Sequence, residues 1–195
     1  MDDAKATLHH YLQAARDALL WKLEGLDERA ARWPRTPTGT NLLGLVKHAA
    51  SIEIGYFGDV FGRSWPTPEE VPWIAEDADD NADMWATADE PTAWVVDLYR
   101  RVWTFADAAI TELDLDAVGR VPWWPTDRNE VTLLRVVTHV TSDLTRHAGH
   151  ADILRELIDG HAGLRPDSTN LPDMTAEAQA AYVQRLQDVA DAAGS

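Results

Sequence analysis

Four side chains that can bind a metal ion or transfer a proton lie close together in the sequence: His139, Asp143, His147 and His150. In a helix each residue turns by ~100°, so Asp143 differs from His147 by ~40° and from His150 by ~20°. These three side chains therefore project from one helix face, and ligands at positions i and i+4 are a common way to hold a metal. His139 lies ~12 Å from His147 along the helix axis, too far to share that metal. We assign it to the core or to the surroundings of the site.

A catalytic metal site needs a further ligand from another part of the chain, and His48 is the candidate. It lies in an expected second helix, ~60° from Leu45 and ~40° from Ile52 on the apolar face. Two histidines and one carboxylate leave coordination positions open, as a catalytic metal requires. We therefore predict a divalent metal ion, zinc first and nickel second, with His48, Asp143 and His147 as its ligands.

Each of these residues also has an ordinary structural interpretation. An inward-facing histidine can simply hydrogen-bond a buried carboxylate, and Asp143 with His147 can form a buried ion pair. The convergence of several polar groups on apolar helix faces favours the metal, because an unpaired carboxylate in the interior is costly. On spacing alone, the metal site and the structural cluster stand as equal alternatives.

The elements that must position these residues are helices. Apolar residues at helical spacing predict them at about 3–25, 40–61, 90–114, 129–159 and 174–192. The first four carry long apolar stripes, which predicts an all-α fold: a four-helix bundle with an additional C-terminal helix. We expect no strand pair, no repeat and no interdomain linker, and take residues 1–195 as one domain. The irregular stretch at 62–88 is long, which is typical of a functional lid.

Residues with special backbone preferences predict where these helices begin and end. Thr38 or Thr40 is expected to cap the second helix through its hydroxyl group. Pro91 is expected at the first position of the third helix. Gly160 is expected to end the fourth helix.

Composition limits the classes of partner and compartment. The 33 acidic and 17 basic residues give a formal net charge of −16, which repels phosphate backbones, so we expect no nucleic-acid partner. No apolar run approaches the ~20 residues of a membrane span, and the N-terminus lacks the pattern of a signal peptide. We therefore predict a cytoplasmic protein without a membrane partner. The chain has no cysteine, so any thiol chemistry must use a thiol from a cosubstrate.

Several segments of the chain carry a resemblance to a known superfamily. They are 42–48 (LLGLVKH) with Glu53 and 56–58 after it, 81–85 (NADMW), 121–124 (VPWW) and 146–160 (RHAGHADILRELIDG). These segments resemble the DinB superfamily of metal-dependent four-helix bundles. Within it they look like an actinobacterial subfamily related to mycothiol-dependent maleylpyruvate isomerase. The similarity covers nearly the whole chain, and it implies a bundle with up-down-down-up helix order.

The resemblance also implies a ligand set. Superfamily members have one metal-binding histidine on the second helix and a His-x-x-x-His pair on the last bundle helix, which His48 and His147 match. Asp143 departs from the commonest form, although the isomerase has Glu-x-x-x-His there. A carboxylate is therefore compatible with zinc, while the short reach of Asp143 leaves direct ligation open. His150 stands where many relatives have glutamine, and is either a fourth ligand or a group beside the open site.

The characterised superfamily members use the low-molecular-weight thiols mycothiol, bacillithiol or glutathione. A bound zinc ion lowers the pKa of a thiol and presents the thiolate as a nucleophile. The resemblance thus predicts a metal-dependent S-transferase or isomerase, with mycothiol or another such thiol as cosubstrate and a small-molecule electrophile. We expect His150 or Glu53 to transfer a proton. Residues 62–88 and Trp123-Trp124 can line the electrophile site, although packing is the favoured role of the two tryptophans.

The sequence leaves other functions open. One is a non-catalytic bundle that binds a metal or small ligand in a stress response, and another is a metal-dependent hydrolase whose open position holds water. A DNA-acting protein, suggested only by the name of the superfamily, is disfavoured by the net charge of −16. Both the monomer and the homodimer are compatible with the sequence.

Overall fold

The computed structural model describes residues 4–194, and they form mainly helices, which confirms the all-α fold. The long helices are α1 (Ala4–Leu20), α3 (Leu42–Phe57), α4 (Thr92–Glu112), α5 (Leu133–Asp159) and α6 (Ala176–Ala193), and α2 (Glu28–Arg32) is short. Single 3-10 turns are η1 (Trp21–Leu23), η2 (Asp59–Phe61), η3 (Pro68–Glu70), η4 (Pro72–Ile74) and η5 (Ala82–Met84). None of the helices in residues 4–194 combines the length and hydropathy of a membrane span.

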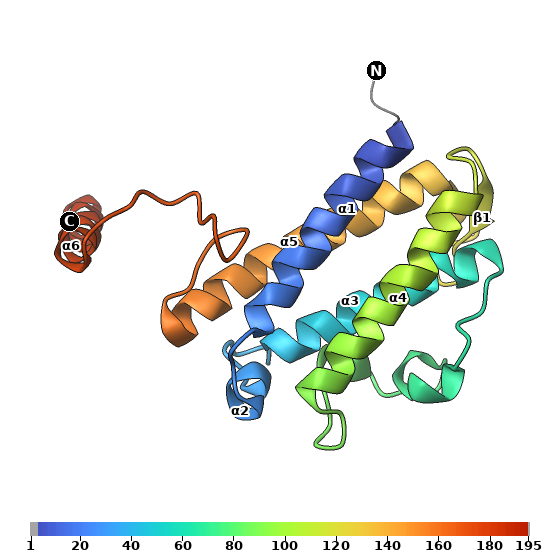
Figure 1. Ribbon diagram of the computed structural model, residues 1–195, viewed down its shortest axis with the longest axis horizontal. Helices are drawn as coiled ribbons and strands as arrows, with labels where there is room; N and C mark the ends of the chain where they lie inside the picture. The colour runs from blue at the N-terminus through green and yellow to red at the C-terminus, as the bar shows by residue number, and fades with distance from the viewer. Residues whose placement is uncertain (1–3, 195) are drawn as a thin grey trace.

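Helices α1, α3, α4 and α5 form the bundle. Helix α1 packs mainly against α5, and α3 packs against both α4 and α5. Figure 1 shows α1 and α5 running in one direction and α3 and α4 in the other, which is the up-down-down-up order. Because α3 and α4 are parallel neighbours, the chain must return along the bundle between them. Residues 58–91 make this return, which explains the length of the irregular stretch.

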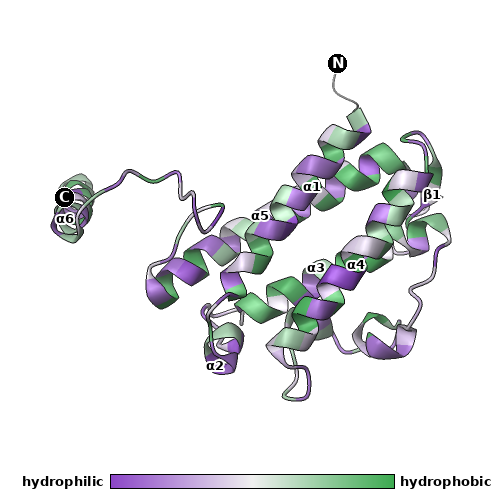
Figure 2. Ribbon diagram, viewed as in Figure 1, coloured by the Kyte–Doolittle hydropathy of each residue, from purple (hydrophilic) through white to green (hydrophobic). Residues whose placement is uncertain are grey.

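Helix α3 is the most enclosed element of the bundle. Twelve of its 16 residues are buried, and it is green, that is hydrophobic, over most of its length (Figure 2). Burial on several faces is possible because α3 has α4 on one side and α5 on another. A polar side chain on α3 therefore faces the protein interior unless it lies at a seam open to solvent.

A short strand pair joins α4 to α5, so the expectation of no strands was wrong. Strands β1 (Val118–Arg120) and β2 (Glu130–Thr132) are antiparallel, with Gly119 opposite Val131. Three residues per strand are too few to produce a readable alternation of apolar and polar side chains. A Cβ on Gly119 would lie 2.6 Å from the carbonyl oxygen of Val60, so this close approach requires glycine.

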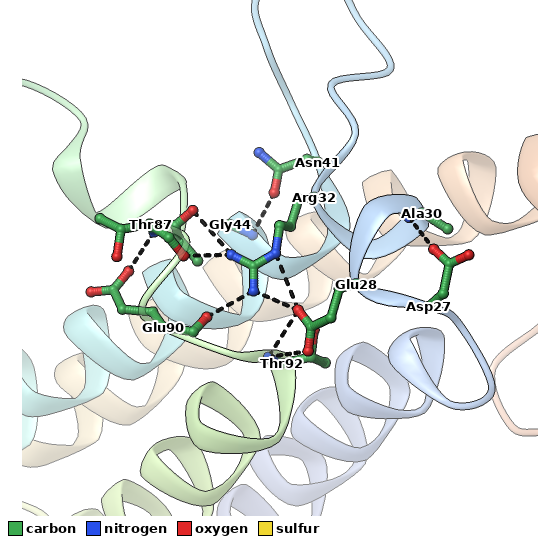
Figure 3. Close-up of polar contacts among 10 residues, drawn as sticks. Asp27, Glu28, Ala30, Arg32, Asn41, Gly44, Thr87, Glu90 and Thr92 are labelled. Carbon is green, nitrogen blue, oxygen red and sulfur yellow. Dashed lines mark hydrogen bonds and ion pairs between the residues drawn. The ribbon is translucent and has the colours of Figure 1, made fainter.

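The ends of the helices partly follow the predictions. Gly160 ends α5 in the left-handed conformation, with φ of 81°, as expected. The N-cap of α3 is Asn41, whose side chain accepts a hydrogen bond from a backbone amide of the first turn (Figure 3). Thr38 and Thr40 were therefore wrong as caps, and their hydroxyl groups lie 3.5 Å from each other. Pro91 was expected at the first helical position of α4, but it is the N-cap, and the helix begins at the next residue.

An arginine-centred network ties the end of the long connection to α2 and α4 (Figure 3). The Arg32 guanidinium donates to the carbonyl oxygens of Thr87 at 2.5 Å and Glu90 at 3.0 Å. It also donates to the Glu28 carboxylate at 3.1 and 2.5 Å. That carboxylate accepts the backbone N–H of Thr92, the first residue of α4, at 2.9 Å. The network holds the connection in place just after the segment that reaches the site.

Candidate metal centre

His48 from α3 and Asp143 and His147 from α5 come together where the two helices pack. Oδ2 of Asp143 lies 3.8 Å from Nε2 of His48 and 3.6 Å from Nε2 of His147. The three ligand atoms all lie within 4.8 Å of one another. The two imidazole rings are 4.9 Å apart with an angle of 73° between them. The structure therefore brings together the three residues that the sequence suggested as ligands.

These donor atoms fit a divalent cation better than a hydrogen-bonded cluster. The two separations exceed normal hydrogen-bond lengths. Oδ2 of Asp143 and Nδ1 of His147 are buried without a hydrogen-bond partner among residues 4–194. Ligand atoms ~2.1 Å from a tetrahedral zinc ion lie roughly 3.4 Å apart, close to the distances between these groups. A buried, unpaired carboxylate oxygen is costly, and a cation between the three groups would satisfy it.

A fourth residue, Asp83 on η5, supports the site from the long connection. Its Oδ2 lies 2.6 Å from Nδ1 of His48, and the side chains are 25% and 17% exposed. Metal-binding histidines commonly donate their second nitrogen to a carboxylate, which fixes the ring and makes it a stronger ligand. Sequence reasoning missed this role. Asp83 is one of several acids at 76–83, and nothing in the pattern distinguishes it from the others.

The segment that carries Asp83 is held directly on α3. The Asn41 side chain donates to the carbonyl oxygen of Met84 at 3.3 Å. A Cβ on Gly44 would lie 1.8 Å from that same oxygen, so the close contact depends on glycine. Buried Lys47 donates to the carbonyl of the residue after Met84 at 3.0 Å. Three residues at the start of α3 thus hold the loop that carries Asp83 beside His48.

The electrostatics favour the protonation states that bind a cation. Burial lowers the pKa of His147, and the charges of His48 and His150 lower it further, against the opposing effect of Asp143. A neutral imidazole is the form that ligates a metal. Burial opposes ionisation of Asp83, but its hydrogen bond to His48 and the charge of His48 hold the pKa of Asp83 below its usual value. Asp83 is therefore an ionised acceptor for the ring N–H of His48.

The two remaining histidines of α5 lie in different surroundings. The ring of His150 is exposed and lies 5.4 Å from that of His147, on the solvent side of the cluster. His139 packs instead beside Tyr56 and Trp124, with ring centroids 4.9 and 5.5 Å away. His139 is exposed, so its assignment to the core was wrong. Of these two histidines, only His150 lies beside the cluster.

Glu53 belongs to a separate buried network. Its carboxylate accepts hydrogen bonds from Arg16 on α1 and from the Tyr99 hydroxyl on α4, at 2.5 and 3.0 Å. The side chains of Glu53 and Arg16 have no exposed surface. Glu53 follows His48 by five residues, so the two project ~140° apart on α3. This position suits Glu53 for holding three helices together rather than for moving a proton at the metal centre.

The sequence that folds into this bundle matches a known family. The family model described as mycothiol S-transferase matches residues 7–160. The chain belongs to the mycothiol S-transferase family. The match spans α1 to α5 and includes all four residues of the candidate metal centre, whereas α6 lies beyond it. This family is part of the DinB/YfiT-like superfamily, so the resemblance seen in the sequence is confirmed.

A solved structure supports the fold of this family member. A conserved protein from Enterococcus faecalis matches 83% of this chain and 100% of that chain, with a TM-score of 0.65 and 16% identity. At 16% sequence identity, this similarity is evidence for the bundle fold and for nothing about function. Among curated proteins, the comparison found no match. The evidence on function therefore comes from membership of the mycothiol S-transferase family, which indicates an S-transferase function related to mycothiol.

Proposed function

We propose that this chain transfers the sulfur of mycothiol to a small-molecule electrophile, with a divalent metal, zinc first, held by His48, Asp143 and His147. One observation carries the proposal. Three donor atoms from two helices converge within 4.8 Å, and the carboxylate oxygen among them is buried without a hydrogen bond from any residue of the described range 4–194. This cluster lies inside the residues that match the mycothiol S-transferase family.

The ligand set suits the activation of a thiol. Two neutral histidines and one carboxylate leave a divalent ion with net positive charge and open coordination positions. When bound, such an ion supplies the charge that lowers the pKa of a thiol and favours its thiolate. The chain contains no cysteine, so the sulfur comes from the cosubstrate.

The residues of the chain divide the remaining tasks. Asp83 accepts the Nδ1–H of His48 and thereby turns Nε2 toward Asp143. His150, exposed beside His147, accepts the proton that the thiol loses and releases it to solvent. The sulfur electron pair then forms the new bond to the electrophile, and the leaving group departs with the electrons of the bond that breaks.

The electrophile site extends along the seam between α3 and α5 toward the connection before β2. Trp123 is 51% exposed there and lies edge-on to Tyr56, with ring centroids 5.2 Å apart. Trp124 packs against His139, two helical turns from His147. An exposed indole beside packed aromatic rings offers a flat apolar wall, which suits an electrophile with an apolar or planar group.

Cobalt-substituted protein tests this proposal. Saturating mycothiol should produce the strong near-ultraviolet charge-transfer band of thiolate bound to Co²⁺. His147→Ala should lose the band, and His139→Ala, a change of the same type on the same helix, should keep it. If mycothiol gives no band and no low-molecular-weight thiol raises the melting temperature, the transferase proposal fails. A non-catalytic ligand-binding bundle then becomes the leading interpretation.

A further inference from the structure

Helix α6 stands apart from the bundle. Figure 1 shows it beyond the end of α5, at the far end of an extended link. None of its residues, Ala176–Ala193, is buried. It also lies outside the part of the chain that matches the family, residues 7–160. The bundle and its metal centre are thus complete without α6, which needs another explanation.

The side chains of α6 form one apolar face. Tyr182, Leu186 and Val189 project within ~60° of one another, and they are 38%, 49% and 64% exposed. The acidic residues of α6 lie on the opposite face. A helix of this length gains most of its stability from packing an apolar face. The face is therefore built to be covered.

A groove that could receive the apolar face of α6 runs between α1 and α5. Its cavity has a volume of about 600 Å³. Its lining includes small residues, Ala14, Ala15 and Ala18 from α1 and Ala148 and Gly149 from α5, together with the polar and charged residues His10, Gln13, Asp17, Thr145, Asp152 and Arg165. The small residues leave room for larger apolar groups from another helix. The groove lies away from the metal centre, because Ala148 projects ~100° from His147 on α5.

The start of the link is fixed at the edge of this groove. The Trp21 indole N–H donates to the carbonyl oxygen of Leu164 at 2.9 Å, and buried Lys22 donates to that of Gly163. Leu164 and Arg165 line the groove. From there, residues 166–175 can extend over about 33 Å. The link is therefore long enough to carry α6 away from the groove of its own chain.

We propose that α6 docks in the α1–α5 groove of a second copy of this chain, and that mutual exchange forms a two-fold dimer. The structure of the single chain leaves α6 off its own groove, so the neighbour provides the site. Charge supports the fit: Arg185, the one basic residue of α6, borders the apolar face, and Asp17 lines the groove. Exchange of one element between identical chains is a low-cost route to a dimer.

The contact area is near what such a dimer needs. A helix of 18 residues is about 27 Å long and about 10 Å wide, so it covers ~270 Å² on each surface that it joins. Two exchanged helices then bury ~1,100 Å² in total. Stable interfaces begin at about 1,200 Å², so we expect a reversible dimer that dissociates on dilution.

A crosslinking experiment tests the exchange, because the chain has no cysteine of its own. A double variant, Ala14→Cys with Val189→Cys, places one thiol in the groove and one on α6. A short bifunctional maleimide should give a covalent dimer on a denaturing gel, at twice the chain mass of 21.7 kDa. Val189→Cys alone should give none. A crosslinked monomer would mean that α6 folds back on its own chain, and no crosslink would mean that it stays free; either overturns the proposal.

A second measurement removes the apolar contact without touching the metal centre. Leu186→Glu should abolish the crosslinked dimer and shift the unmodified protein to a monomer in light scattering at tens of micromolar. Gln184→Glu, the same new side chain on the opposite face of α6, should leave the dimer unchanged. Metal content should be equal in all variants, so failure of the exchange is distinguishable from failure of the thiol proposal. Unchanged dimerisation in Leu186→Glu would contradict the docking.

Discussion

The buried pair of Arg16 and Glu53 predicts a large loss of stability for Glu53→Gln. Neither side chain has exposed surface. Arg16 donates to the carboxylate at 3.0, 3.1 and 2.5 Å, and the Tyr99 hydroxyl donates to it at 3.0 Å. Removing the charge of one partner leaves the other charge buried without full compensation, which typically costs ~3–5 kcal/mol.

The structure places the expected cost at the lower end of that range. Burial acts to lower the pKa of Arg16, but the charges of Glu53 and Asp107 together raise it above its ordinary value, so Arg16 is charged. In the variant, Arg16 keeps its hydrogen bond to Asp107 at 2.8 Å. We therefore expect a loss of ~3 kcal/mol. In a protein of this size each kcal/mol lowers the melting temperature by ~2–4 °C, so the drop should be ~6–12 °C.

Thermal and urea unfolding followed by circular dichroism measure this change. The matched control is Glu112→Gln, which removes an exposed ion pair with Arg63 of 2.7 Å and should cost less than ~1 kcal/mol. Metal content should be the same in both variants. A Glu53→Gln protein with wild-type stability but no thiol transfer would refute the reasoning, and would restore Glu53 as a proton-transfer group.

Two further predictions concern the metal centre. Elemental analysis should find about one divalent ion per chain, lost in His48→Ala and His147→Ala; wild-type protein that stays metal-free after zinc supplementation would contradict the site. Gly44→Ala places a Cβ 1.8 Å from a backbone oxygen of the loop, so it should displace Asp83 and weaken zinc binding ~10–100-fold, as Asp83→Asn should. Gly149→Ala, where a Cβ meets nothing within 4 Å, should bind zinc as the wild type does. Equal affinities for Gly44→Ala and the wild type would remove the loop from the site.

The sequence determined the helices and the part of the site that depends on one helix. Apolar residues at a period of 3.6 mark a buried face wherever the partner lies, so α1, α3, α4 and α5 were predictable as bundle helices. The same period places Asp143 and His147 side by side without knowledge of any other element. His48 could be assigned to an inward face in the same way. The sequence alone could not show that His48 lies close to Asp143 and His147, because that distance depends on how α3 packs against α5.

Tertiary structure alone decided everything that depends on contacts distant in the chain. Asp83 lies in a stretch without periodicity, and only the contact of its loop with Gly44 on α3 selects it from its acidic neighbours. Glu53 faces inward in the sequence pattern, but only the structure pairs it with Arg16, 37 residues away, in a network apart from the candidate metal centre. Helix α6 shows an apolar face in the sequence, while its position off the bundle appears only in the structure. Helical periodicity is a local property of the backbone, whereas these placements depend on which surfaces meet when the chain packs.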